Sequence, residues 1–269
     1  MEFGTMNPLL LVLGATGEVG RAVVATALAE GRGVVAVARG LAGLESLRLA
    51  HPGADLTLLR GSVATDRQSA QLLRALRRLR RPLSGAVVAL CGGCVRERLL
   101  DSPMASLKKV IDSNLLAHAS AARHLLPMLA DGTGGYVLVS GPGGEQPWAG
   151  HGPRSLVAAG LRMLARVLHE EARALPVRVQ LLAIDSPLCT ERNRAQACPH
   201  WPQSHSVAQR VLQLVDGDSS TAVPAVVRFD STRASPPPTP KAPPPVLAQQ
   251  VRTWLNRVAA SPSTQGTSP

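Results

Sequence analysis

Three glycines near the start of the chain have the spacing of a phosphate-binding loop. They lie in the segment LVLGATGEVGRAV, between an apolar run and a segment with helical spacing. One glycine permits a tight turn, another lets backbone amides approach a pyrophosphate, and the third lets the helix pack closely on the strand. The helix N-terminus then offers its N–H groups and positive dipole end to the phosphates. The loop residues expected to bind a dinucleotide are Gly14, Thr16, Gly17, Glu18, Val19 and Gly20.

A second apolar run, residues 33–39, ends on Arg39 and has no acidic residue beside it. The residue at this place in a dinucleotide-binding unit contacts the adenosine ribose. An acid there selects NAD, whereas an arginine accommodates the 2′-phosphate of NADP. Arg39 therefore predicts that NADP(H) is bound in preference to NAD(H), although it is also compatible with an ordinary surface arginine.

Candidates for acid–base chemistry occur in the segment GHGPRSLVAAG, residues 150–160. His151 titrates near neutral pH and is the strongest candidate for a proton donor, although it is also compatible with an incidental loop histidine. Arg154 is a poor acid, but it can bind an anionic group or stabilise an oxyanion. Glu145 and Asp185 are weaker alternatives for the acid.

The cysteines favour structural thiols over metal or redox chemistry. Cys91 and Cys94 form C-G-G-C, but the motif follows a predicted strand, not a helix N-terminus that would activate a thiol. Cys189 and Cys198 have poor spacing for the second half of a zinc site. We therefore expect no bound metal.

These residues lie in an alternation of strand and helix patterns. Continuously apolar strands that alternate with helices indicate a parallel sheet covered on both faces. The fold class expected is α/β, a single Rossmann-like doubly wound parallel sheet of about seven strands with an appended C-terminal helix. The predicted strands are residues 8–14, 33–39, 55–61, 85–93, 134–141, 177–185 and 222–230. The predicted helices are residues 18–31, 41–50, 66–81, 103–130, 155–174 and 206–217.

The chain is expected to hold one globular domain, and its other segments differ in composition. The stretch ASPPPTPKAPPP cannot form a helix or a sheet, whereas the following stretch has apolar residues at helical spacing. That helix is expected either to dock on its own domain or to bind a partner. The expected segments are a vector-derived leader at 1–6, the nucleotide-binding domain at 7–233, a proline-rich linker at 234–245, a helix at 246–260 and a disordered tail at 261–269.

Composition narrows the partners. The 269-residue chain has a net charge of +11, yet only 2% of its residues are aromatic, and no nucleic-acid-binding motif is present. No apolar run reaches the roughly 18 residues of a membrane span, and no signal peptide is evident. We therefore expect a cytoplasmic protein that binds neither nucleic acid nor membrane. The arginine cluster at residues 74–81 indicates a solvated helix face or a docking patch for an acidic protein partner.

Residues 8–230 resemble the short-chain dehydrogenase/reductase family. The loop GATGEVGR matches the family's glycine-rich loop in length, with a spacing similar to its extended and atypical branches. GAVVALCGG resembles the fourth strand and its Asn-Asn-Ala-Gly motif, with Cys91 and Gly92 at the last two positions. The resemblance also places Ser62 at the adenine pocket and Thr190 at a threonine that contacts the cofactor.

The catalytic positions agree only in part with this resemblance. Asn114 falls on the family's catalytic asparagine, and Ser140 lies one or two places before the catalytic serine. Arg154 stands where the family has its tyrosine, and Ala158 where it has its lysine. That tyrosine exchanges a proton with the substrate, and the lysine lowers its pKa. The resemblance therefore implies a rearranged catalytic centre built from Asn114, Ser140, His151 and Arg154.

The resemblance leaves three functions open. The first is an NADP(H)-dependent oxidoreductase, similar to carbonyl reductases, that acts on a small-molecule or carrier-bound substrate. The second is a non-catalytic regulator or scaffold that binds the cofactor. The third is a non-redox enzyme, such as a cyclase or dehydratase, on the same fold. The resemblance also implies a homo-oligomer, a dimer or tetramer formed through the fourth and fifth helices and the last strand.

Overall fold

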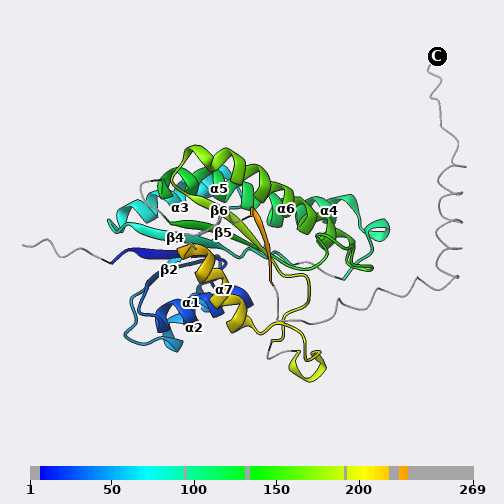
Figure 1. Ribbon diagram of the computed structural model, residues 1–269, viewed down its shortest axis with the longest axis horizontal. Helices are drawn as coiled ribbons and strands as arrows, with labels where there is room; N and C mark the ends of the chain where they lie inside the picture. Colours follow the sequence, from blue (N-terminus) through cyan, green and yellow to red (C-terminus); the bar gives the residue numbers. More distant parts are fainter. Residues whose placement is uncertain (1–6, 94–95, 131–133, 191–192, 218–223, 230–269) are drawn as a thin grey trace, which may run out of the picture. The chain divides into compact units, whose positions relative to one another are not determined.

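The computed structural model describes residues 7–93, 96–130, 134–190, 193–217 and 224–229. Its seven strands form one all-parallel sheet in the order β3-β2-β1-β4-β5-β6-β7 (Figure 1). The strands are β1 (Leu9–Leu13), β2 (Gly33–Ala38), β3 (Leu56–Arg60), β4 (Leu83–Val88), β5 (Gly135–Ser140), β6 (Arg178–Ala183) and β7 (Val226–Arg228). The expected doubly wound α/β fold is confirmed.

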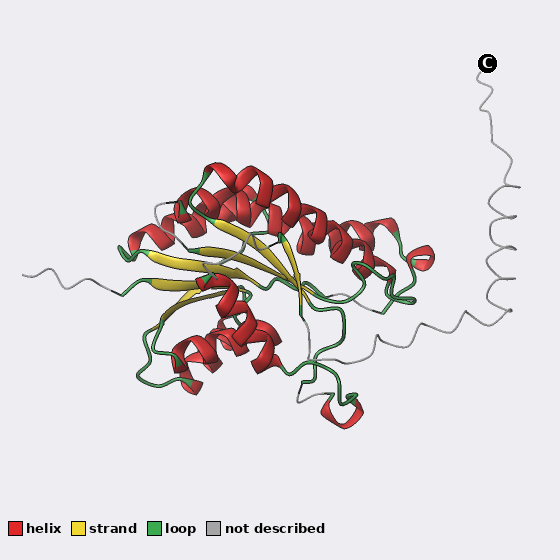
Figure 2. Ribbon diagram, viewed as in Figure 1, coloured by secondary structure: helices red, strands yellow, loops and turns green. Residues whose placement is uncertain are grey.

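Helices cover both faces of the sheet. The helices are α1 (Glu18–Ala29), α2 (Leu41–Ala50), α3 (Asp66–Arg78), α4 (Met104–Ile111), α5 (Ala117–Leu129), α6 (Gly152–Glu171) and α7 (Ser204–Asp216). Helices α3, α4, α5 and α6 lie on one face, and α1, α2 and α7 lie on the other (Figures 1 and 2). Each face buries its own cluster of leucine, valine and alanine side chains. The core of this aromatic-poor chain is therefore mainly aliphatic, and burial of these side chains is the dominant contribution to the stability of the fold.

The order of the strands reverses between β1 and β4. The chain runs from β1 outward to β3, and then returns to pair β4 with the other edge of β1. The loops that follow β1 and β4 consequently diverge onto opposite faces and leave a crevice at the carboxyl ends of the strands, where such folds bind ligands. This topology places the glycine loop after β1 beside the segment Ala89–Cys91 that follows β4.

The prediction of one regular helix over residues 103–130 is wrong. A π-helical turn, η2 (Asp112–Leu116), separates α4 from α5. The Asn114 side-chain amide donates to the Val110 carbonyl at 2.8 Å, the acceptor that the Asn114 backbone N–H would use in a regular α-helix. A single turn with an inserted residue is often found at functional sites. The predicted strand over 222–230 is shortened to β7, and residues 218–223 lie outside the described residues.

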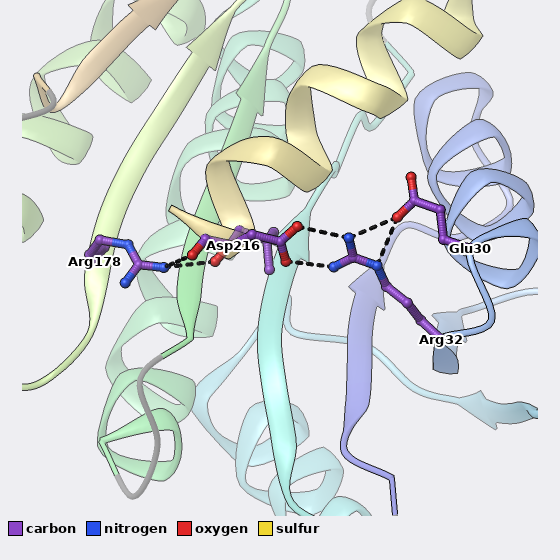
Figure 3. A network of polar contacts seen from close by, with 5 residues as sticks. Glu30, Arg32, Arg178 and Asp216 are labelled. Atoms are coloured by element: carbon purple, nitrogen blue, oxygen red, sulfur yellow. Dashed lines mark hydrogen bonds and ion pairs between the residues drawn. The ribbon is translucent and has the colours of Figure 1, made fainter. Parts of the chain in front are cut away.

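A polar network joins α1 and α7 to the sheet at the amino ends of the strands, opposite the crevice (Figure 3). Arg32, just before β2, donates to both carboxylate oxygens of Asp216 at 2.6 and 2.8 Å, and its Nε donates to Glu30. The hydrogen-bonded Asp216 carboxylate raises the pKa of Arg32 above its ordinary value. Arg178, the first residue of β6, donates to the last carbonyls of α7, at Val215 and Asp216. These bonds join the segment between α1 and β2, and the start of β6, to the end of α7.

The described surface has features that bear on the expected partners. No helix in the described ranges has the length and apolar character needed to cross a membrane. The arginines of α3, such as Arg74 and Arg77, are exposed. Their exposure is compatible with docking of an acidic protein, which stays a prediction. Large apolar side chains are exposed on η2 and α6, including Leu116, Leu156 and Met163. They are compatible with a subunit interface, and the homo-oligomer also stays a prediction. The leader and the segments expected at 234–269 lie outside the described residues.

His118 of α5 gives the fold a dependence on pH. Its side chain is fully buried, and its Nδ1 donates to the Asn114 carbonyl. Burial lowers the pKa of the ring from 6.5 to about 4. The unfolded chain therefore binds a proton at this histidine between pH 6.5 and 4 while the folded chain does not, so the folded state loses stability as the pH falls.

Between pH 7 and pH 5, this difference is expected to lower the free energy of unfolding by about 2 kcal/mol. The measurement is urea denaturation of the wild type and of His118→Gln at both pH values. The variant should lose this part of the pH dependence, whereas His51→Gln, a change outside the core, should keep it. Equal pH slopes in the wild type and His118→Gln would show that His118 is not the group responsible.

Candidate functional site

The glycine loop after β1 packs closely against the backbone that follows β4 on one side and faces the cavities on the other. Gly14 has a φ of +76°, which a residue with a side chain rarely adopts, and a Cβ there would overlap the Ala89 carbonyl oxygen. A Cβ at Gly20 would overlap the backbone of Gly14. At Gly17 a Cβ would only touch the Gly14 carbonyl oxygen, at 3.4 Å, so this residue could carry a methyl group without overlap. The loop is therefore a cradle that side chains would fill.

The start of α1 offers donors to this cradle. Gly17 is the N-cap and provides no side chain, so the first-turn N–H groups lack a side-chain acceptor. The Arg21 guanidinium donates to the Thr16 carbonyl at 2.9 Å and holds the loop in place. Free N–H groups at a helix N-terminus form a site for phosphate, and the residues present fit the pyrophosphate of a dinucleotide.

Two cavities meet above this loop. The first has a volume of about 230 Å³ and extends from the glycine loop to the ends of β2 and β3. The second has a volume of about 390 Å³ and extends toward α6 and the segment after β6. Gly17 and the segment Ala89–Cys91 line both, so the cavities form one continuous groove across the crevice.

The groove brings together most of the predicted site residues. The first cavity is lined by Gly14, Thr16, Gly17, Arg39, Ser62, Cys91 and Gly92. The second is lined by Gly17, Glu18, Val19, Cys91, Asn114, Ser140, Arg154 and Thr190. Gly20 lies below the loop, where it allows α1 to approach. Within the described residues no group of three His, Cys, Asp or Glu side chains could hold a metal ion, and Cys94 lies outside them.

Asn114 fastens the loop after β4 to the helix beside it. Its Oδ1 accepts a hydrogen bond from the Gly92 N–H at 2.7 Å, and its amide donates to Val110 and to Ser113. A Cβ at Gly92 would lie 2.6 Å from the Ser113 hydroxyl oxygen. The π-helical turn therefore gives Asn114 the position from which it shapes the floor of the second cavity.

Ser140 and Thr190 lie on the far side of the second cavity. Ser140 ends β5 and is buried, and its hydroxyl donates to the Gly141 carbonyl at 3.3 Å. Thr190 is positioned by Asn193, whose side chain accepts from the Thr190 N–H and donates to the Leu188 carbonyl. Asn193 was not among the residues predicted for the site. Its signal is that of a side chain that hydrogen-bonds its local backbone, which is common to many loops.

Arg154 lies in the first turn of α6, and Ala158 follows one turn later on the same face. Both line the second cavity. The guanidinium carbon of Arg154 is 5.7 Å from the centre of the Trp148 ring, a favourable cation–π distance. The backbone N–H of Trp148 donates to the Ser155 hydroxyl at 3.0 Å and holds Trp148 beside α6.

His151 is not among the residues that line either cavity. Its ring stacks on Trp148 at 3.9 Å between centres, and its backbone pairs with Glu97. Burial lowers the pKa of the His151 ring, and the charges of Arg154 and Arg96 lower it further. The ring lies outside the groove and stacks on Trp148, which in turn contacts Arg154 of the cavity wall.

The two weaker acid candidates are engaged elsewhere. Glu145 and Asp185 both form ion pairs with Arg162, a buried residue of α6. Arg228 at the end of β7 pairs with the same two carboxylates. This network joins the β5–α6 loop to the segment after β6, and each of these segments contributes residues to the second cavity. Sequence reasoning missed Arg162, because an arginine on a predicted amphipathic helix is usually solvated.

Comparison with known families identifies this arrangement. Residues 8–196 match the family model described as short chain dehydrogenase. The chain belongs to the short-chain dehydrogenase/reductase family. This is a family of oxidoreductases that use NAD(P)H, and its members share the Rossmann-like fold found here. A search of curated proteins finds no match.

Solved structures of the family share the fold at low identity. The NADPH-bound short chain oxidoreductase of Pseudomonas aeruginosa PAO1, described as containing an atypical catalytic center, has a TM-score of 0.73 and 20% identity over 85% of this chain and 98% of that one. An oxidoreductase of the family from Burkholderia thailandensis has a TM-score of 0.72 and 23% identity over 93% and 98%. The 3-hydroxyacyl-CoA dehydrogenase type-2 of Mycobacterium avium has a TM-score of 0.71 and 21% identity over 86% and 97%.

Proposed function

We propose that this member of the family binds NADP(H) along the groove and reduces a carbonyl substrate at a rearranged catalytic centre. The observation that carries the proposal is the continuity of the groove. It passes from Arg39 at the end of β2, over Gly17, to Ser140 and Arg154. An extended dinucleotide needs such a path, with its phosphates at the start of α1.

The preference for NADP(H) is supported by the charge around the first cavity. Arg39 lines it, and no acidic residue in the described chain does so. Arg60 lies nearby and donates to the Arg39 carbonyl at 3.3 Å. A ribose 2′-phosphate at this end meets positive charge without a carboxylate to repel it.

The residues of the second cavity support carbonyl chemistry without the family's tyrosine and lysine. When bound, NADPH supplies a hydride to the carbonyl carbon, and the oxygen takes a proton from the medium, which yields an alcohol and NADP⁺. The Ser140 hydroxyl can turn from the Gly141 carbonyl and donate its hydrogen bond to the carbonyl oxygen of a substrate, and Asn114 holds the adjoining loop. His151 acts in this proposal as a positioning residue, because it supports Trp148 beside Arg154.

A second candidate is a regulator that binds the cofactor without turnover. It is favoured by one observation, that Arg154 and Ala158 line the cavity at the positions where the family carries its proton donor and its lysine. Both candidates need the cofactor, so they differ only in whether the bound NADPH is consumed.

The test is a fluorescence titration of the protein with NADPH and with NADH. NADPH is expected to bind more tightly, and Arg39→Ala should weaken its binding by about tenfold or more, since the guanidinium pairs with a charged phosphate. Binding of NADH should change little. Arg74→Ala, which removes an exposed arginine of α3, should leave both affinities unaltered.

Failure of both cofactors to bind would overturn the proposal. If NADPH binds, its consumption with a panel of ketones and aldehydes separates the two candidates. Turnover that falls in Ser140→Ala supports the oxidoreductase, whereas binding with no turnover across the panel supports the regulator.

A further inference from the structure

The second cavity is lined by one arginine, Arg154, that has no carboxylate partner among the described residues. Among the charged residues that line it in the described chain, Arg154 lies at the α6 side and Glu18 at the glycine-loop side. The Arg154 guanidinium forms no ion pair or hydrogen bond with any described residue, and it contacts the ring of Trp148. Its five N–H donors are therefore available to a ligand.

A second arginine of the same helix, Arg162, does have carboxylate partners. Arg162 is two turns further along α6 and is buried, and it meets the carboxylates of Glu145 and Asp185. Arg154 is partly buried and has neither. An arginine that lines a cavity and has no carboxylate partner can bind an anionic ligand there through charge-assisted hydrogen bonds.

The rest of the second cavity is apolar. Side chains from β5, α6 and the segment after β6 form its walls, and Ala158 leaves open the space where the family has a long lysine. The apolar lining residues are Val139, Val157, Ala158, Leu161, Ile184 and Leu188. A ligand that fills this space must bury an apolar body while it presents a charged group to Arg154.

We infer that the substrate of this protein is a small carbonyl compound with an apolar body and a carboxylate, and that Arg154 binds the carboxylate. The inference rests on the proposed function and names its substrate class. A carboxylate is planar and carries one charge, which matches the planar fork of a single arginine. A phosphate dianion fits less well, because no second cation lines this cavity within the described residues. The Trp148 ring contacts the guanidinium from one side.

The test compares ligands that differ only in charge. 3-Phenylpropanoate and its neutral amide are titrated calorimetrically into the whole protein, with phenyl phosphate as a third probe. The carboxylate should bind at least about tenfold more tightly than the amide, as expected for charge-assisted hydrogen bonds. Arg154→Gln should remove this preference, and Arg154→Lys should recover only part of it, because an ammonium keeps the charge but lacks the fork.

Arg166→Gln is the matched control, since Arg166 is exposed on the same helix and does not line the cavity. It should keep the full preference. Equal affinity for acid and amide in the wild type, or an equal loss in Arg166→Gln, would overturn the carboxylate site. Tighter binding of phenyl phosphate would overturn the carboxylate class. The titration with NADPH is separate, so a failure of cofactor binding and a failure of this site give different results.

Discussion

Gly17→Ala and Gly20→Ala, two substitutions three residues apart, are expected to fail in different ways. Gly20→Ala should destabilise the fold by about 3 kcal/mol, because its methyl group would overlap the backbone of Gly14 and neither side can yield without moving α1. Gly17→Ala should fold with a free energy of unfolding within about 1 kcal/mol of the wild type, because its φ of −77° suits alanine and its methyl group would make only an ordinary contact with the Gly14 carbonyl oxygen.

Cofactor binding separates the same two variants. Gly17 lines both cavities, so its methyl group would occupy the place where phosphates approach the start of α1. The affinity of Gly17→Ala for NADPH should therefore fall by about tenfold or more, although its free energy of unfolding stays close to that of the wild type. Urea denaturation and fluorescence titration measure the two effects. NADPH affinity that is unchanged in Gly17→Ala would mean that the cofactor phosphates do not pass over this loop.

The second large effect is expected from Arg162→Met. The Arg162 side chain is 7% exposed and faces two carboxylates, Glu145 at 45% and Asp185 at 36% exposure. Removing one partner of a buried ion pair is strongly destabilising, but both carboxylates here retain access to water and to Arg228. We therefore expect the free energy of unfolding to fall by about 2 kcal/mol, measured by urea denaturation.

Arg228→Met is the matched comparison, because Arg228 meets the same two carboxylates from a side chain that is 56% exposed. Its loss should cost less than about 1 kcal/mol. Arg162→Met should also weaken binding of 3-phenylpropanoate, because Glu145 and Asp185 anchor the segments that border the second cavity. Equal losses of stability in the two variants would show that burial of Arg162 does not set the strength of the network.

Much of the fold could be predicted because its signals are local. Continuously apolar runs such as residues 33–38 are typical of strands buried on both faces, and their alternation with amphipathic segments indicates parallel strands. The π-helical turn at Asp112–Leu116 was not predicted. It depends on the Asn114 side chain meeting Gly92, which is 22 residues away and reaches it only when β4 and α5 are in place.

The candidate site divides in the same way. The sequence by itself determined the glycine loop, the arginine at the end of the second strand and the absence of a tyrosine and a lysine on α6, because each is a residue type at a fixed distance from a strand or helix end. Only the tertiary structure decided that Arg154 lines the cavity while His151 stacks outside it, and that Glu145 and Asp185 are paired with Arg162. Those outcomes depend on which side chains from separate loops meet at the carboxyl edge of the sheet. The spacing of residues along the chain does not predict contacts between side chains from separate loops.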